Sequence, residues 1–358
     1  MNLLRCLLPG LAILAVSSPA GYSIFSPAAI GNLPKAAGST TAQRVIAAAD
    51  SALTVAPTPM PRVHTEGTLP HKGIRDESLA AERDWGHMLD LALAYRLTGT
   101  RKYLDAEARF LGAWMAVYKP SLNPIDETPM DQVLIAFDLT QADLPADLQA
   151  STTTFLRAMA EGYLGYIEGH PDRHNAENWQ SHRIKLATMA AFALGDEDLI
   201  RRAKKGFELQ IGMNIRPDGS VEDFYKRDAL HYVTYDLDPL QMAALTAKSH
   251  GQDWFHYRSP EGSSLASAVD WLLPYASGEK PHEEFVHSTV GFDAARNKAG
   301  EKSYAGPWDP QNSLRTLALA ATLDSKYDAP FQALAEQGKG QVPVWIRLLR
   351  DASKSPGG

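Results

Sequence analysis

Apolar residues recur along most of the chain at the three- and four-residue spacing of an α-helix. In residues 79–99, for example, the apolar positions are Met88, Leu89, Leu91, Leu93 and Leu97. The same reading predicts further helices at residues 103–118, 153–167, 178–194, 198–211, 229–250, 264–275, 312–323 and 330–336. Strand-like alternation is scarce, so the pattern predicts an all-α fold.

Three of these helices end in a tight turn that leads directly into another helix. Residues 94–99 lead into 103–106, residues 191–196 into 199–203, and residues 318–324 into 327–334. Successive antiparallel helix pairs are the unit of an α/α toroid or solenoid. We therefore expect an incomplete (α/α) toroid or barrel of antiparallel helical hairpins, with a cleft where long loops gather at one rim.

Four loops rich in polar residues or proline interrupt the helices, at residues 118–129, 169–177, 216–226 and 282–310. The last is long and has few helix signals. Long structured loops in compact domains usually bind a ligand or cover a site.

The first twenty residues have the parts of a secretory signal peptide. A basic segment at residues 1–5 precedes an apolar stretch at residues 7–16, which is too short to span a bilayer. A small-residue cleavage site follows at residues 18–20. We expect cleavage after about Ala20, leaving residues 21–358 as one periplasmic or secreted domain. The alternative is an uncleaved anchor.

Composition limits the chemistry further. The one cysteine, Cys6, lies in the predicted signal, so the mature protein would have no disulfide and no thiol catalysis. The formal net charge is −7, and removal of Arg5 with the signal makes it −8. That charge argues against general binding to nucleic acid or anionic membranes, although a locally basic cleft can still bind a polyanion.

Three segments combine the side chains most useful for catalysis near predicted helix starts: residues 174–183, 223–232 and 286–296. In the first, Asn178 and His182 are four residues apart and share one helix face. In the second, His231 and Tyr232 point about 100° apart on a helix, so we expect only one of them to face the cleft.

Each candidate also has a structural interpretation. Asn178 can cap a helix, and Tyr232 can be a core aromatic. Arg183 can be a surface cation paired with Glu177 or Asp228. The adjacent cations at positions 226 and 227 can simply be solvated.

Taken together, two runs of sequence resemble the alginate-lyase superfamily with an α/α-barrel. The first, at residues 217–240, contains PDGS, ALHY and DLDPL. The second contains FVHS at residues 285–288, followed by Phe292, Asp293, Arg296, Gly300, Tyr304 and Trp308. The similarity spans about residues 79–335. It is closest to polysaccharide lyase family 38, whose members cut glucuronan-type or mannuronate-type chains, and more distant from family 5.

The family 5 pattern is matched only in part. Its catalytic tyrosine matches Tyr232, and an asparagine of its Asn-Asn-His run matches Asn178. The histidine of that run is replaced by Trp179. His182, one helical turn beyond Asn178, is the expected substitute.

The arginine of family 5 is also displaced. It lies seven residues before the tyrosine, a position occupied here by Tyr225, while Lys226 and Arg227 are adjacent. These departures favour family 38.

The resemblance implies β-elimination, in which the C5 proton of a uronate is removed and the O4 glycoside leaves. The uronate carboxylate must be neutralised so that it can accept charge, while a base and an acid move the protons. In β-1,4-linked glucuronate and mannuronate, H5 and O4 lie on one face of the ring. A single tyrosine can therefore serve as both base and acid.

These requirements assign roles. Tyr232 is the expected base and acid, and Asn178 and His182 neutralise the carboxylate. Arg227 or Lys226 tunes the tyrosine or holds a carboxylate, and His231 is a competing proton-transfer group. Expected substrate contacts are Arg183, Trp179, Tyr225, His287, Arg296 and Trp308, with Trp85 as a further sugar platform. We expect no cofactor and no metal, because the histidines lack a ligand pattern such as H-E-x-x-H. The expected partner is an acidic polysaccharide, bound by a monomer.

Two other classes of function remain open. A glycoside hydrolase on the same toroid needs two carboxylates across the scissile bond, for which candidates are Asp84, Glu127, Glu222 and Asp223. A non-catalytic periplasmic uronate-binding protein would keep the cleft without turnover. Only a lyase yields a 4,5-unsaturated product that absorbs ultraviolet light.

Overall fold

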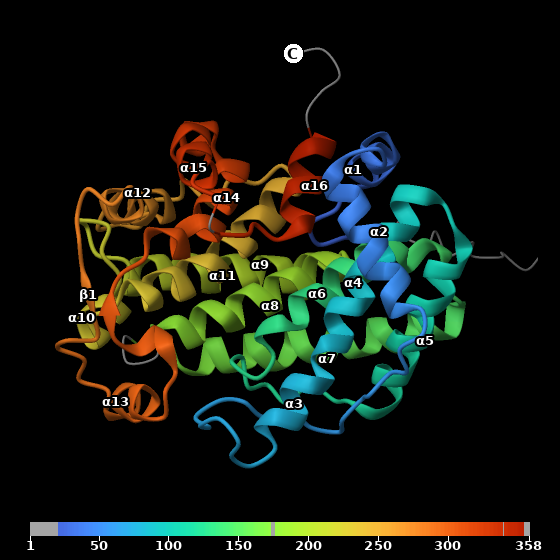
Figure 1. The fold of residues 1–358 in the computed structure, drawn as a ribbon, viewed down its shortest axis with the longest axis horizontal. Helices are drawn as coiled ribbons and strands as arrows, with labels where there is room; N and C mark the ends of the chain where they lie inside the picture. The colour runs from blue at the N-terminus through green and yellow to red at the C-terminus, as the bar shows by residue number, and fades with distance from the viewer. Residues whose placement is uncertain (1–20, 173–175, 339, 354–358) are drawn as a thin grey trace, which may run out of the picture.

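Helices form nearly all of the regular structure in the computed structural model, which describes residues 21–172, 176–338 and 340–353 (Figure 1). The helices are α1 (Pro27–Asn32), α2 (Thr40–Ala52), α3 (Arg75–Ala81), α4 (Arg83–Thr98), α5 (Arg101–Val117), α6 (Asp131–Thr140), α7 (Ala146–Gly169), α8 (Asn178–Leu194), α9 (Glu197–Asn214), α10 (Glu222–Arg227), α11 (Leu230–Ser249), α12 (Leu265–Ala276), α13 (Gly291–Lys298), α14 (Leu314–Leu323), α15 (Asp328–Ala335) and α16 (Val344–Ser353). Two short strands, β1 (Glu283–Glu284) and β2 (Gly306–Pro307), pair antiparallel. The prediction of an all-α fold is confirmed.

Successive helices pack against each other as hairpins. Helix α4 contacts α5, α7 contacts α8, and α8 contacts α9. Helices further apart in the chain also pack together, since α4 contacts α6 and α11 contacts α14. At the two ends of the described chain, α16 packs on α1 and α2. Figure 1 shows α8 crossing the middle of the molecule, with α14 to α16 above it and α13 and α3 below.

Helix α8 is buried on all sides, because it packs against α6, α7, α9 and α11. A helix that is buried on all sides is usually apolar on all sides, because no face of it meets solvent. It nevertheless carries a series of buried polar residues, namely Asn178, Gln180, Ser181, His182, Arg183, Lys185 and Thr188. Buried polar groups need hydrogen-bond partners. We therefore expect the polar residues of α8 to bind groups on neighbouring helices or a ligand.

Several element boundaries differ from the predicted ones. Helix α6 was not predicted, because it is buried on almost every side and so lacks a clear apolar stripe. The segment 282–310 was expected to be a loop but contains α13 and both strands. Helix α13 is only eight residues long and mostly polar, so periodicity gives little signal there.

The first described residues are anchored on α6. The Asp138 carboxylate accepts hydrogen bonds from the backbone N–H of Ser23 and of Ile24, both at 2.7 Å. Gln141 donates to the carbonyl of Gly21 at 2.8 Å. The predicted signal peptide, residues 1–20, lies outside the described residues. Within the described part of the chain, no helix has the length and apolar character needed to cross a membrane.

Candidate active site

The start of α11 is fixed by groups from two other segments. Asp228 precedes it in the left-handed conformation, with φ of 49°, which short polar residues tolerate better than most. Glu284 of β1 accepts hydrogen bonds from the backbone N–H of Leu230 at 2.7 Å and of His231 at 3.0 Å. A carboxylate at this position satisfies free N–H groups and opposes the positive end of the helix dipole. These contacts hold Tyr232, in the same turn, in place.

Tyr232 is almost fully buried and meets two arginines. Arg296 of α13 donates from Nη1 to the Tyr232 hydroxyl at 3.0 Å, and also to the Tyr304 hydroxyl. The Arg227 guanidinium lies 3.8 Å from the centroid of the Tyr232 ring. One cation thus faces the hydroxyl and another faces the ring. Negative charge that develops on the Tyr232 oxygen would be stabilised by both.

Arg227 is itself held by carboxylates. Its Nη1 donates to Asp293 at 2.5 Å, and its Nε lies 3.7 Å from Asp223. Lys226 points elsewhere and pairs with Glu177 at 2.5 Å, partly exposed to solvent. Of the two cations expected to act on the tyrosine, the structure brings Arg227 to it and Lys226 to Glu177.

Asn178 lies at the first turn of α8 and is bound to Asp223. Its backbone N–H donates to this carboxylate at 2.7 Å and its side-chain amide at 2.8 Å. Burial raises the pKa of Asp223 to about 6, and the nearby Glu177 adds to the rise. Because Asp223 also lies near Arg227, it links the predicted carboxylate-binding asparagine to the arginine on the Tyr232 ring.

His182 lies one turn further along α8 and is fully buried. Its Nδ1 is 3.4 Å from the Thr128 hydroxyl, while its Nε2 has no hydrogen-bond partner among the described residues. Its ring packs on Tyr235, with 4.4 Å between centroids. Burial lowers the pKa of His182 well below its usual value, and Lys185 and Arg315 lower it further. The imidazole is therefore neutral near pH 7 and can offer a hydrogen bond but no full charge.

His231 lies in the same aromatic cluster as Tyr232. Its ring centroid is 5.2 to 6.4 Å from four others, those of Tyr232, Tyr235, Phe285 and Tyr304. Phe285 packs against both the His231 and the Tyr232 ring, and the expectation that only one of the two faces the cleft stays a prediction. Burial lowers the pKa of His231 to about 4, with added effects of Arg296 and Arg227.

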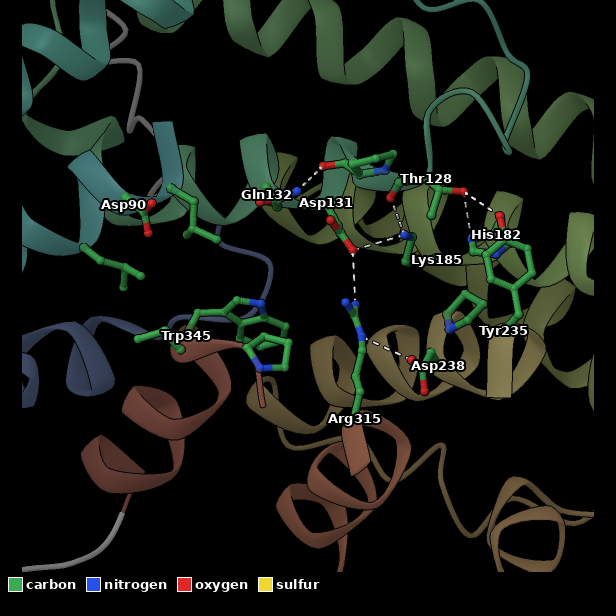
Figure 2. Close-up of a pocket in the computed structure, with 16 residues that line it drawn as sticks. Asp90, Thr128, Asp131, Gln132, His182, Lys185, Tyr235, Asp238, Arg315 and Trp345 are labelled. Carbon is green, nitrogen blue, oxygen red and sulfur yellow. Dashed lines mark hydrogen bonds and ion pairs between the residues drawn. The ribbon is translucent and has the colours of Figure 1, made fainter. Parts of the chain in front are cut away.

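A cavity of about 430 Å³, here called the inner cavity, adjoins His182 and Tyr235 (Figure 2). Residues of α4, α6, α8, α11, α14 and α16 line it. A chain of ion pairs crosses its wall: Lys185 to Asp131 at 3.1 Å, Arg315 to Asp131 at 3.8 Å, and Arg315 to Asp238 at 3.1 Å. None of these charged residues was predicted, because each stands alone on a separate helix and only the fold gathers them.

Arg183 does not form the surface pair considered as its structural alternative. It is buried, its guanidinium lies 3.8 Å from the Tyr166 ring centroid, and its Nη1 donates to Gln180 at 3.2 Å. Trp179 lies further off, with 5.6 Å between its ring centroid and the guanidinium. The reason is the burial of α8, which leaves Arg183 no route to Glu177 or solvent.

Other expected substrate contacts lie at the edge of the site. Tyr225 is 47% exposed and covered on one face by the Arg216 guanidinium, 3.5 Å from its centroid. His287 is exposed, and its Nδ1 lies 2.9 Å from the Asp228 carboxylate. The structure thus places neither ring in the cluster around Tyr232.

Two of the three tryptophans expected to contact sugar, Trp85 and Trp308, are core residues. Trp85 is inaccessible to solvent and packs edge-on against Trp114, with 5.1 Å between centroids. Trp308 is 8% exposed and belongs to the main hydrophobic core. Within the described ranges, no group of three or more His, Cys, Asp or Glu side chains is arranged to hold a metal ion.

The chain is similar in sequence to known polysaccharide-degrading lyases. A family model described as alginate lyase matches residues 34–282. A polysaccharide lyase of Stenotrophomonas maltophilia is 30% identical over 142 residues, which cover 39% of this chain and 42% of the relative. An alginate lyase of the same organism is 23% identical over 223 residues, covering 55% of this chain and 29% of the relative. The chain thus matches less than half the length of either relative.

Solved structures share the fold. An alginate lyase from Bacteroides ovatus superposes with a TM-score of 0.63 at 17% identity, covering 94% of this chain and all of that one. A variant of alginate lyase A1-III, an enzyme of a Sphingomonas species, complexed with a tetrasaccharide, gives a TM-score of 0.58 at 19% identity, covering 96% and 100%. The predicted incomplete (α/α) toroid is confirmed.

Proposed function

The chain belongs to the alginate lyase family, and we propose that it is a polysaccharide lyase acting by syn β-elimination at Tyr232. Its substrates are β-1,4-linked D-uronate chains, either glucuronan-type or mannuronan-type. The products are 4,5-unsaturated oligosaccharides. The names of its relatives, a polysaccharide lyase and an alginate lyase, support the reaction class.

The observation that carries this proposal is the contact between Arg296 and the Tyr232 hydroxyl, 3.0 Å long. Among the described residues, Arg296 has no carboxylate partner within ion-pair distance, whereas Arg227 is already paired with Asp293. Arg296 is therefore a cation available to a substrate carboxylate, placed beside a group able to move a proton.

The geometry supports the following sequence of events. A uronate enters beside Tyr232, and its carboxylate binds Arg296 and the free Nε2 of His182. Tyr232, in its ionised form, takes the C5 proton while charge moves into the neutralised carboxylate. The phenol then returns the proton to O4 as the glycosidic bond breaks. Because one residue acts on one face, D-uronates with H5 and O4 on the same side are preferred over guluronate.

The hydrolase alternative lacks a free pair of carboxylates among its candidates. Each accepts structural hydrogen bonds: Asp84 from Thr58 and Trp114, Glu127 from Tyr118 and Ser121, Glu222 from Arg216, and Asp223 from Asn178. Carboxylates held in this way are not positioned to protonate a leaving group and to activate water. The lyase proposal needs neither.

We also propose export through the predicted signal peptide, so that the enzyme meets its substrate in the periplasm or outside the cell as a monomer. Sizing of the exported protein and its N-terminal mass check both points.

A substrate panel tests the proposed reaction. Glucuronan, polymannuronate, polyguluronate and hyaluronan are incubated with the protein, and ultraviolet absorbance is compared with reducing ends released. We expect absorbing products from glucuronan or polymannuronate, and slower reaction of polyguluronate. Reducing ends without absorbance would identify a hydrolase. Binding without any product from the whole panel would identify a non-catalytic protein.

A further inference from the structure

Two tyrosine hydroxyls meet at one nitrogen of Arg296. Its Nη1 donates to the Tyr232 hydroxyl at 3.0 Å and also to the Tyr304 hydroxyl. Both tyrosines are nearly buried and belong to the same cluster, and their hydroxyls also form a hydrogen bond with each other. The proposed function gives Tyr232 a task and leaves Tyr304, a second hydroxyl at the same position, without one.

A short turn after α13 brings Tyr304 back onto Arg296. The backbone N–H of Glu301 donates to the Arg296 carbonyl at 3.1 Å, and that of Tyr304 donates to the Glu301 carbonyl at 3.3 Å. Gly300 allows this reversal, because its φ of 85° lies in the region that favours glycine. The Phe285 ring packs on the Tyr304 ring, with 5.0 Å between centroids. The turn and this packing together fix the second hydroxyl beside the first.

The hydrogen bond between the two hydroxyls has one donor and one acceptor at any moment. Burial raises the pKa of Tyr304, and negative charge on Tyr232 and the hydrogen bond to it raise that pKa further, although Arg296 lowers it. Tyr304 therefore keeps its proton when Tyr232 is ionised and can donate it in a hydrogen bond. The ionised Tyr232 oxygen would then accept from two fixed donors, Arg296 and Tyr304.

We infer that Tyr304 is a positioning residue of the elimination, whose hydroxyl donates to the Tyr232 oxygen and stabilises the ionised form that removes the C5 proton. This inference rests on the proposed function, because it assumes that Tyr232 is the base. A hydrogen bond to an ionised oxygen is about twice as strong as one between neutral groups. Tyr304 therefore stabilises the ionised Tyr232 more than the neutral one.

The proton and electron balance of the reaction does not change. The C5–H bond breaks, its proton passes to the Tyr232 oxygen, and its electrons form the double bond between C4 and C5. The C4–O4 bond then breaks, and O4 receives the proton from Tyr232. Tyr304 keeps its own proton throughout, so it acts only through Tyr232.

Other charged and titratable groups face the two tyrosines from α10, α11, α13 and the turn that follows α13: Arg227, His231, Tyr235, Arg296 and Glu301. Tyr304→Phe removes none of these groups, and it keeps the aromatic ring that packs on Phe285. A change in the pH dependence of turnover in this variant therefore comes from the lost hydroxyl.

The test measures kcat and KM of the wild type and Tyr304→Phe on the best substrate of the panel, from neutral to alkaline pH. Tyr304→Phe should lower kcat about tenfold at neutral pH, the usual effect of a hydrogen bond to a charged group, and leave KM within about twofold. The deficit should shrink as the pH rises, because a higher pH restores the ionised form. The rising limb of the pH profile should move upward by about one pH unit, the equivalent of that tenfold change.

Tyr327→Phe is the matched control. It also removes the hydroxyl of a buried tyrosine, which donates to the Ala266 carbonyl at 3.0 Å. Tyr327 lies between α14 and α15, on the other side of α8 from α13 (Figure 1). This variant should keep the kcat, the KM and the pH profile of the wild type. Circular dichroism at each pH checks that both variants stay folded.

The outcomes separate this inference from the proposed function. If Tyr232→Phe is inactive and Tyr304→Phe matches the wild type at every pH, the inference is wrong and the proposed function stands. A loss of the same size at every pH would also overturn the inference, because it would mean that Tyr304 only supports packing. If the wild type forms no unsaturated product from the panel, the proposed function and the inference fail together.

Discussion

At the Tyr232 hydroxyl, one guanidinium group makes the direct contact and a second covers the ring. Arg296 supplies the first and has no described carboxylate partner, and Arg227 supplies the second and is paired with Asp293. The two arginines therefore have different tasks. Arg296 contacts the oxygen where charge develops and is free to bind substrate, whereas Arg227 adds positive charge at the ring face and holds the ring in position.

Replacement of Arg296 tests this division. Arg296→Ala should lower kcat by about 10²- to 10³-fold, the usual effect of removing one group that stabilises developing charge. Arg296→Lys should recover part of the loss, because it restores the charge but not the planar geometry. Arg101→Ala, an exposed arginine on α5, is the control and should match the wild type. A kcat for Arg296→Ala within about twofold of the wild type would contradict the assignment.

His231 predicts a specific dependence of stability on pH. Its pKa is lowered to about 4 by burial, whereas an unfolded histidine titrates at about 6.5. Between these values the unfolded chain binds more protons, so this contribution to stability is complete above pH about 6.5 and is lost as the pH falls toward 4. His231→Gln should therefore lose less unfolding free energy than the wild type across this interval, as measured by urea unfolding. Equal losses in the two proteins would contradict the burial argument.

At the level of single residues, spacing predicted the parts of the site that lie close in sequence. Asn178 and His182 were placed on one helix face, and Tyr232 was placed near Arg227. Tyr304 was noted only as part of the family resemblance and given no role. Lys185 and Arg315 were missed, since their partners are tertiary neighbours 54 and 77 residues away from them on other helices.

Among the elements, α11 depends on a cap supplied from a distant strand. Glu284 of β1 accepts from the N–H groups of Leu230 and His231 and is itself buried. The same strand pairs with β2, so the 282–308 segment both caps α11 and supplies Phe285 to the cluster around Tyr232. The cap thus connects the stability of α11 to the geometry of the site.

Removal of this cap should affect both stability and turnover. Glu284→Ala should cost about 1 kcal/mol or more of unfolding free energy, the usual loss of a helix cap, and should also lower kcat because Tyr232 shifts. Ser264→Ala, which removes the capping box of α12, should cost similar stability and leave kcat unchanged. Urea unfolding and steady-state kinetics give both values. Equal kcat in the two variants would show that the cap does not position the tyrosine.

Periodicity located the long elements well, since α8 was expected at the residues it occupies. It failed for α6, whose nearly uniform burial hides the period, and for α13, which is short and polar. Periodicity measures the contrast between a buried and an exposed face. Elements without that contrast are found only from the tertiary structure.

At the scale of the whole molecule, the first described residue, Gly21, packs tightly against the C-terminal end of α8. A Cβ added at Gly21 would lie 2.2 Å from the Phe192 carbonyl oxygen and 2.4 Å from the backbone nitrogen of Gly195, both at the end of α8. The hydrogen bonds from the backbone of Ser23 and Ile24 to the Asp138 carboxylate keep Gly21 from moving away from α8. Only glycine fits this close approach of two backbones.

Gly21→Ala should therefore lower the unfolding free energy by about 2 kcal/mol, within the usual cost of overpacking a tight contact. Gly31→Ala is the matched control, because a Cβ there meets nothing within 4 Å and the residue lies in α1. It should leave stability unchanged or slightly higher. Thermal unfolding of both variants checks the pair, and equal midpoints would refute the close contact.

The central claim is that the Tyr232 oxygen carries the proton in the elimination. The most direct measurement is the rate at which Tyr232→Phe forms ultraviolet-absorbing product from the best substrate of the panel. This variant removes one oxygen atom and keeps the ring that Arg227 covers. The account predicts a loss of about 10³-fold in kcat, with fold and substrate binding retained. A correctly folded Tyr232→Phe protein that forms unsaturated product at close to the wild-type rate would contradict it.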